Sequence, residues 1–129
     1  MGSRNHPRRK QVYSTGVLID MKLSEYQRRA SRTIPKDQEV SSLLTNFCMG
    51  LSGEGGELID HFKKVLFHGH NLDKEYVEKE LGDLLWYIAA ISSTLKLDLS
   101  VIGDINIDKL ERRYPDGFSQ QKSQNREDG

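Results

Sequence analysis

Two short segments of the chain carry acidic side chains in the same pattern. Glu54 and Glu57 are three residues apart, and so are Glu80 and Asp83. On an α-helix, positions three apart lie on one face about one turn from each other, so each segment can present two carboxylates together. Carboxylates held close together repel one another unless a cation neutralises them, and ligation by oxygen alone favours Mg²⁺ or Mn²⁺. We therefore predict a metal site built from these four carboxylates.

Each of the four acids immediately precedes a position of an apolar stripe, the pattern that marks the buried face of a helix. The stripes are Leu44, Cys48, Leu51, Gly55, Leu58, Phe62 and Val65 around the first pair, and Val77, Leu81, Leu84, Ile88, Ile91 and Leu95 around the second. If the two helices pack antiparallel, the acids converge at the edge of a shared core. A single acid pair is typical of a solvated surface in a chain with 29% charged residues. Two pairs with the same relation to a buried face favour a site.

The pattern of apolar positions and helix-capping residues predicts an all-α fold with four helices. The expected helices span about 24–33, 41–67, 74–97 and 101–113, with Ser24, Asp73 and either Asp98 or Ser100 as caps and Gly69 as the stop of the second helix. The second helix contains four glycines within seven residues: Gly50, Gly53, Gly55 and Gly56. Each costs an exposed helix about 1 kcal/mol relative to alanine. Either the helix breaks there, or close approach of another helix or of a ligand requires small residues.

Three regions differ in composition and predict the domain organisation. Residues 1–20 are basic and weakly periodic, which indicates a disordered extension or a leader. A phosphate-binding or nucleic-acid-binding arm is the alternative interpretation of its arginines. The compact domain is expected over residues 21–118, and the polar residues 119–129 predict a flexible tail.

Composition excludes several classes of protein. The 129 residues carry a formal net charge of +0, which argues against a bulk electrostatic partner such as nucleic acid. No apolar run approaches the roughly 20 residues of a membrane span, so no membrane partner is expected. The single cysteine, Cys48, fits a reducing compartment and predicts a cytoplasmic location. Its place on the apolar stripe predicts a small core residue.

Several segments together resemble the MazG-like nucleoside triphosphate pyrophosphohydrolases. The two acid pairs form an E-x-x-E and E-x-x-D signature, separated by the 22 residues 58–79. The resemblance runs over about 23–118. It includes Gly53 to Glu57, Lys63-Lys64 through His70, Glu80 to Tyr87, Asn106 to Lys109, and Arg113 to Phe118.

This resemblance implies a four-helix MazG-like bundle that is completed by assembly into a homodimer or a dimer of dimers. It implies Mg²⁺-dependent cleavage of a nucleoside triphosphate between its α- and β-phosphates, giving a nucleoside monophosphate and pyrophosphate, and a role in nucleotide-pool housecleaning. By motif position, the four acids would be metal ligands and catalytic residues, with Asn106 and the basic side chains of Lys109 and Arg113 facing the substrate phosphates. Two alternatives remain: a non-catalytic helical module that binds nucleotide and metal, and a phosphoribosyl-ATP pyrophosphatase.

Three further side chains near the acids each have two possible interpretations. Trp86 and Tyr87 follow the second acid pair, and we expect core packing for both. A subunit interface for Trp86 and a contact between Tyr87 and the substrate base or sugar are the functional alternatives. His61 lies one turn after Glu57 and is expected to be a surface histidine, with a hydrogen bond to a ligand as the alternative.

Overall fold

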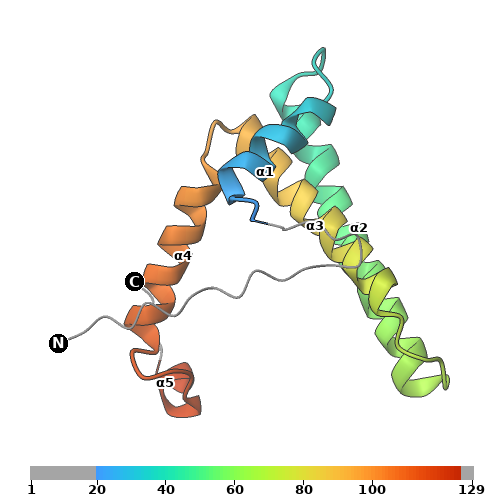
Figure 1. Cartoon of the computed structure of the whole chain (residues 1–129), viewed down its shortest axis with the longest axis vertical. Helices are drawn as coiled ribbons and strands as arrows, with labels where there is room; N and C mark the ends of the chain where they lie inside the picture. Colours follow the sequence, from blue (N-terminus) through green and yellow to red (C-terminus); the bar gives the residue numbers. More distant parts are fainter. Residues whose placement is uncertain (1–19, 126–129) are drawn as a thin grey trace.

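The computed structural model describes residues 20–125, which form helices joined by loops (Figure 1). The helices are α1 (Leu23–Ala30), the short 3₁₀ helix η1 (Ser31–Thr33), α2 (Val40–Phe67), α3 (Lys74–Thr94), α4 (Leu99–Arg113) and α5 (Gln120–Gln124). The all-α prediction is therefore confirmed for this part of the chain. The expected extension, apart from Asp20, lies outside the described residues.

The helix α2 runs without a break through its four glycines. A Cβ added at Gly50 would overlap Cζ of Tyr87, so the ring of Tyr87 occupies the space that a larger side chain would need. Gly53, Gly55 and Gly56 have open space at the corresponding position. Of the two alternatives drawn from the sequence, close approach explains Gly50, and no helix break occurs.

The helix ends follow the capping signals in most places. Asp73 accepts a hydrogen bond from the backbone N–H of Tyr76, and Asp98 accepts one from Ser100. Gly69 has a φ of 71°, and the N–H of His70 donates to the carbonyl of Lys64, which closes the end of α2. The helix expected near 24–33 is present, but its predicted cap was wrong: the cap position is Lys22, which makes no capping side-chain hydrogen bond, and not Ser24.

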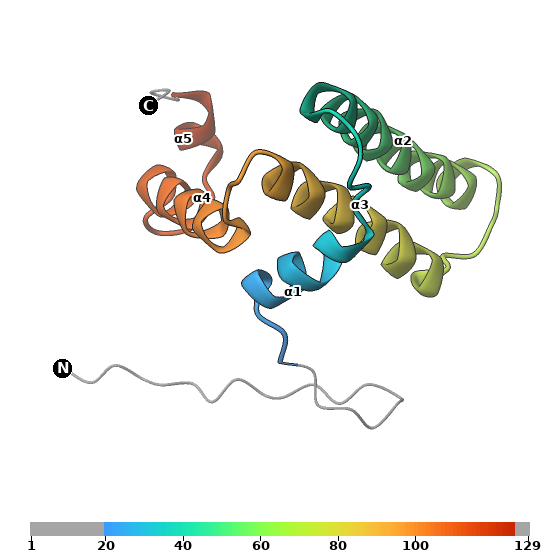
Figure 2. The ribbon, with the colours of Figure 1, turned by 90° about the horizontal axis from the view of Figure 1, so that it is seen from above.

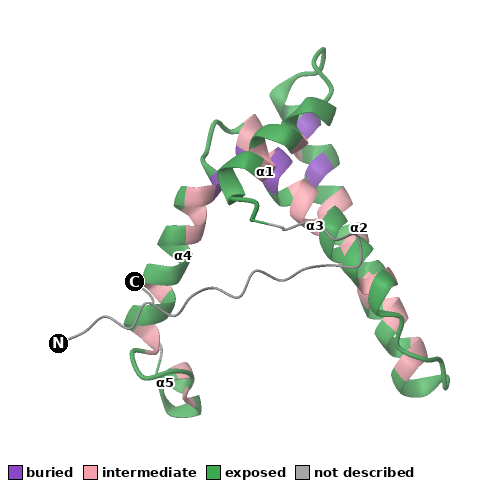
Figure 3. Cartoon of the chain, viewed as in Figure 1, coloured by how far each residue is buried: buried purple, intermediate pink, exposed green. Residues whose placement is uncertain are grey.

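The core lies where α1, η1, the first half of α2 and the second half of α3 meet (Figure 3). Phe47 and Trp86 pack edge to face with ring centroids 5.3 Å apart, and Leu43 and Ala90 complete the buried cluster. The indole N–H of Trp86 donates to Thr33 Oγ1 at 2.8 Å, which ties η1 to α3. The expected core packing of Trp86 and Tyr87 is thus confirmed.

One side chain, Gln27 of α1, fixes the corner between α3 and α4. Its amide nitrogen donates to Ser93 Oγ and to the carbonyl of Leu97, and its carbonyl oxygen accepts from the N–H of Leu99. The chain bends by 108° at this corner, so α4 forms one arm of an open V and the α2–α3 hairpin forms the other (Figure 1). Seen from above, α3 runs between α1 and α2 (Figure 2).

Much of the apolar surface of the hairpin is uncovered. Leu81, Ile88 and Leu95, spaced seven apart on α3, expose 52%, 40% and 47% of their surface. The prediction that these stripe positions are buried was wrong for the single chain, because α3 packs on α2 and α1 through a neighbouring face. Cys48 is likewise exposed and not a core residue, since no described element covers its side of α2.

A short helix lies near the end of the described residues, and none of the described helices alone meets the test for a membrane span. Within the segment predicted to be a flexible tail, Gln120–Gln124 form a short helix, α5, which Ser119 caps by accepting from the N–H of Lys122. Residues 126–129 lie outside the described part of the chain, and the flexibility of the tail stays a prediction. No single helix within residues 20–125 is long and apolar enough to cross a membrane. The helices α3 and α4 meet that test of length and composition only when taken together as a bent pair.

Candidate metal centre

The α2–α3 hairpin positions the four predicted acids. Glu54 and Glu57 lie one turn apart on α2, and Glu80 and Asp83 lie one turn apart on α3. The two helices pack along each other in opposite directions, so a residue in the middle of α2 faces one in the first half of α3. Unbroken helical geometry through Gly53, Gly55 and Gly56 keeps the first pair in register with the second.

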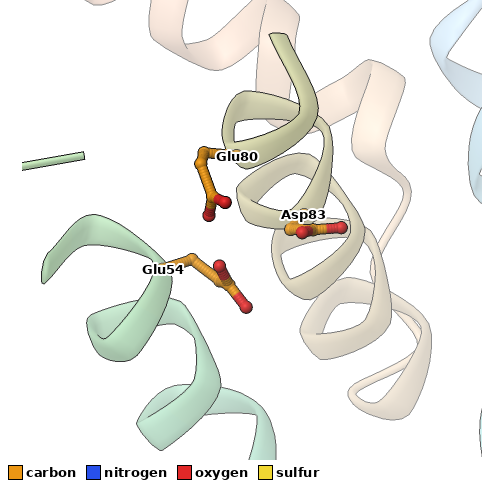
Figure 4. Close-up of side chains that lie close together, drawn as sticks. All are labelled: Glu54, Glu80 and Asp83. Carbon is orange, nitrogen blue, oxygen red and sulfur yellow. The ribbon is translucent and has the colours of Figure 1, made fainter. Parts of the chain in front are cut away.

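The hairpin brings three of the four carboxylates together. One oxygen from each of Glu54, Glu80 and Asp83 lies within 4.8 Å of the other two. Glu54 and Glu80 are half-buried and Asp83 is exposed. The carboxyl groups of Glu54 and Glu80 face each other between the two helices, with Asp83 beside them (Figure 4). Such a set of oxygen atoms can hold a hard divalent cation.

The local electrostatics favour a positive ligand at this cluster. Glu80 Oε2 is buried and has no hydrogen-bond partner, although a buried carboxylate oxygen normally has one. A hydrogen bond shared with Glu80 raises the pKa of Glu54 to about 7, and partial burial and the charges of Glu80, Asp83 and Glu57 add to the shift. The ionised carboxylates offer each other no donor, so a proton or a metal ion can supply the missing positive charge.

Glu57 is the predicted acid that lies outside this group of three. Its Oε2 accepts a hydrogen bond from the hydroxyl of Tyr76 at 3.3 Å. Burial raises the pKa of Tyr76, and the negative charges of Glu80 and Glu57 raise it further, so the phenol remains a donor at neutral pH. Glu57 is therefore held beside the cluster by a neutral group.

The three predicted phosphate contacts lie on the other arm of the fold. Asn106 is exposed, and Lys109 and Arg113 are half-buried on α4. The helix α4 packs on α1 and leaves the corner in a different direction from the hairpin (Figure 1). The single chain does not bring these side chains to the carboxylates, and their part in binding stays a prediction.

Sequence reasoning missed two tyrosines near the acids. Tyr76 precedes Glu80 by four residues, a spacing that places both on one face of α3 and is the signal that could have identified it. Tyr26 on α1 lies near Asp83: burial raises the pKa of Tyr26, and the charge of Asp83 adds to this effect. No local pattern predicts Tyr26, because its position depends on how α1 docks.

His61 has a structural partner. Its Nε2 accepts a hydrogen bond from the backbone N–H of Asp73 at 3.2 Å, and its ring packs on Tyr76 with centroids 5.0 Å apart. The histidine thus links the end of α2 to the start of α3, a role that neither of the two expectations for it included.

Comparison with known proteins assigns the chain to a family. The model of the MazG nucleotide pyrophosphohydrolase domain matches residues 43–118, which contain all four acids. The Gene 37 protein of Mycobacterium phage L5 is 32% identical over 114 residues, covering 82% of this chain and 100% of the phage protein. No solved structure matched the chain. With the family domain spanning more than half of its length, this chain belongs to the MazG nucleotide pyrophosphohydrolase family.

Proposed function

We propose that the protein is a Mg²⁺-dependent nucleoside triphosphate pyrophosphohydrolase that cleaves between the α- and β-phosphates and releases a nucleoside monophosphate and pyrophosphate. The observation that carries this proposal is the convergence of Glu54, Glu80 and Asp83, with one buried oxygen of Glu80 left without a donor. The family assignment supports the class of substrate. Nucleotide-pool housecleaning in the cytoplasm is the role that fits this chemistry.

The donor set fits the proposed cofactor. Three carboxylates supply only oxygen ligands, and Mg²⁺ commonly combines a few carboxylates with water and substrate phosphates. When bound, Mg²⁺ or Mn²⁺ would neutralise the phosphate charge and the charge that develops on the leaving pyrophosphate. The residues that would hold it are Glu54, Glu80 and Asp83.

Glu57 is assigned a different task from the other three acids. It was predicted as a ligand, but it lies beside the group of three and accepts from Tyr76. We infer that Glu57 orients the attacking water and accepts its proton, because it is the acid least engaged by the cation site. Asn106, Lys109 and Arg113 would hold the phosphate chain through hydrogen bonds and charge.

Assembly into a homodimer or a dimer of dimers is part of the proposal. Both helices of the hairpin keep exposed apolar side chains, among them Ile59 at 71% and Leu66 at 72% on α2. Apolar surface of this extent on a helical hairpin favours burial against another subunit. Pairing of two hairpins would complete a four-helix bundle.

A panel of nucleoside triphosphates tests the function directly. Pyrophosphate release is measured for each nucleotide, and for phosphoribosyl-ATP, with Mg²⁺ and with a chelator. We expect Mg²⁺-dependent release from at least one nucleoside triphosphate. Binding of nucleotide without turnover would instead support the non-catalytic module, and turnover of phosphoribosyl-ATP alone would support the other alternative.

Variants of the acids test the assignment of residues. Glu57→Gln and Asp83→Asn each preserve size and remove charge. We expect kcat to fall by about a hundredfold or more in each, since each removes a proton acceptor or a metal ligand. Glu78→Gln, on α3 but outside the cluster, is the matched control and should retain activity. Unchanged turnover in both test variants would overturn the assignment.

A further inference from the structure

Tyr76 stands at the centre of a closed set of contacts at the turn between α2 and α3. The side chain of Asp73 accepts from the backbone N–H of Tyr76, and the backbone N–H of Asp73 donates to His61. The ring of His61 packs on the ring of Tyr76, whose hydroxyl donates to Glu57. Because Glu57 and His61 are four residues apart on α2, the circuit begins and ends on the same helix face.

This circuit fixes the direction of the Tyr76 hydroxyl. The backbone of Tyr76 is anchored in the first turn of α3, and one side of its ring is covered by His61. Tyr76 and Glu80 lie one turn apart on the same face of α3, so the hydroxyl reaches past Glu80 toward α2. Its donation to Glu57 therefore crosses the hairpin beside the three clustered carboxylates.

We propose that Tyr76 is a positioning residue that holds Glu57 in place to act on the attacking water. The assignment rests on the proposed function and adds a residue to it. Glu57 has three rotatable side-chain bonds and lies beside the acidic side chain of Glu54, so without a donor its carboxylate would be free to turn toward solvent. With Oε2 occupied by the tyrosine hydroxyl, Oε1 is left to accept a proton from water.

The distance also bears on this proposal. The two oxygens are 3.3 Å apart, longer than the roughly 2.7 Å typical of an O–H···O bond. Catalytic hydrogen bonds are often long in the absence of substrate and shorten in the reactive complex. A contact of this kind can orient a carboxylate for the reactive complex.

The kinetic test uses Tyr76→Phe, which removes the hydroxyl and keeps the ring that packs on His61. We expect kcat to fall about ten- to a hundredfold, the range for losing a hydrogen bond to a charged group, and KM to change less than about threefold. Tyr114→Phe is the matched control, because Tyr114 lies at the end of α4, outside the hairpin that carries the acids, and its ring packs on Phe118. Its kcat should equal that of the wild type.

A double variant separates positioning from a general structural effect. If Tyr76 acts through Glu57, Tyr76→Phe should have no further effect on kcat when Glu57→Gln is already present. An equal loss in both backgrounds would overturn the proposal, and so would a Tyr76→Phe variant with wild-type kcat. A wild type that hydrolyses no nucleotide would refute the proposed function instead.

A readout without turnover tests the contact itself. The side-chain carboxyl ¹³C resonance of Glu57, identified by its loss in Glu57→Gln, is recorded in metal-free protein. We expect this resonance to shift in Tyr76→Phe and to stay in place in Tyr114→Phe. An unchanged Glu57 resonance in Tyr76→Phe would show that the hydroxyl does not position this carboxylate, whatever the activity.

Discussion

Glu54 and Glu80 show how the packing of two helices can create a position that favours binding of a cation. The hairpin sets their carboxyl groups against each other and buries Glu80 Oε2 without a donor. In the absence of a metal the least costly response is to keep a proton, and the pKa of Glu54 is accordingly raised to about 7 by its hydrogen bond with Glu80, partial burial and nearby negative charge. A divalent cation would displace that proton and use the same oxygens.

This raised pKa predicts how the stability of the metal-free protein depends on pH. The folded protein keeps its proton on Glu54 up to about pH 7, whereas the ordinary value is 4.5. The folded state therefore binds more protons between these values, and the stabilisation, fully present at low pH, is lost as pH rises through 7. We expect the difference in free energy of unfolding between wild type and Glu54→Gln to decline over this range, measured by urea denaturation with a chelator.

The matched measurement adds Mg²⁺. Because the cation favours ionised carboxylates, it should stabilise the wild type more at pH 8 than at pH 5, by mass action on the folded state. The Glu54→Gln variant should show a smaller gain. Parallel pH profiles for wild type and variant, with or without Mg²⁺, would contradict the electrostatic account of the cluster.

At the scale of residues, helical spacing was enough to predict most of the cluster. The i,i+3 pattern and the relation of each acid to an apolar stripe predicted convergence, and Glu54, Glu80 and Asp83 do converge. The separate position of Glu57 could not be predicted, because it depends on how far α3 is shifted along α2 and on the hydroxyl of Tyr76. Spacing within one helix contains no information about that shift.

Of the four glycines in α2, packing requires only Gly50. The ring of Tyr87 lies over Gly50 and is itself packed against Trp86 and Phe47, so it cannot swing away freely. This contact draws α2 and α3 together one turn before Glu54. The close approach of the two helices at Gly50 thus helps to set the distance between the two acid pairs.

A pair of substitutions tests this distinction. Gly50→Ala should destabilise the protein by about 1–3 kcal/mol, because the new Cβ overlaps the Tyr87 ring and the helix-propensity gain is smaller. Gly53→Ala, with open space at its Cβ, should be neutral or stabilising by up to about 1 kcal/mol. Urea denaturation at one protein concentration measures both. A stabilised Gly50→Ala would show that the helices have room to separate.

Helix ends were more predictable than helix faces. Asp73, Asp98 and Gly69 act locally through backbone hydrogen bonds, so their roles could be inferred from sequence and are confirmed. An apolar stripe marks a face that a helix can bury, either within its own chain or against another subunit. Leu81, Ile88 and Leu95 do follow a seven-residue spacing, but all three are exposed. The spacing therefore does not mark the face that α3 buries within this chain.

Residues 20–125 form an open V whose buried core lies at the apex (Figure 3). Phe47, Ala89, Ala90 and Leu99 are almost fully buried there, while most large apolar residues along both arms remain exposed. Burying the exposed apolar side chains of the two arms would stabilise the protein. A second copy of the chain carries the same apolar surfaces and could cover them. The small core and the large exposed apolar surface support the proposed homodimer. They also predict that a charge introduced on the hairpin would weaken it.

Ile59→Lys tests the homodimer on α2. Ile59 is 71% exposed and shares its face with Gly55 and Phe62, at steps of four and three residues. A lysine there costs the single chain little, but a charge buried in an interface is expensive, so the dissociation constant should rise about a hundredfold or more. Analytical ultracentrifugation across a concentration series should show a dimer or larger assembly for the wild type and monomer for Ile59→Lys.

The control is Met49→Lys on the same helix. Met49 is 70% exposed, almost the same as Ile59, but it lies off the periodicity of Gly55, Ile59 and Phe62. Its lysine variant should assemble like the wild type. If both variants dissociate, the interface includes a broader surface of α2, and if neither does, the hairpin face is not where copies meet. A monomeric wild type would remove the four-helix bundle from the proposal while leaving the carboxylate cluster, which lies within one chain, intact.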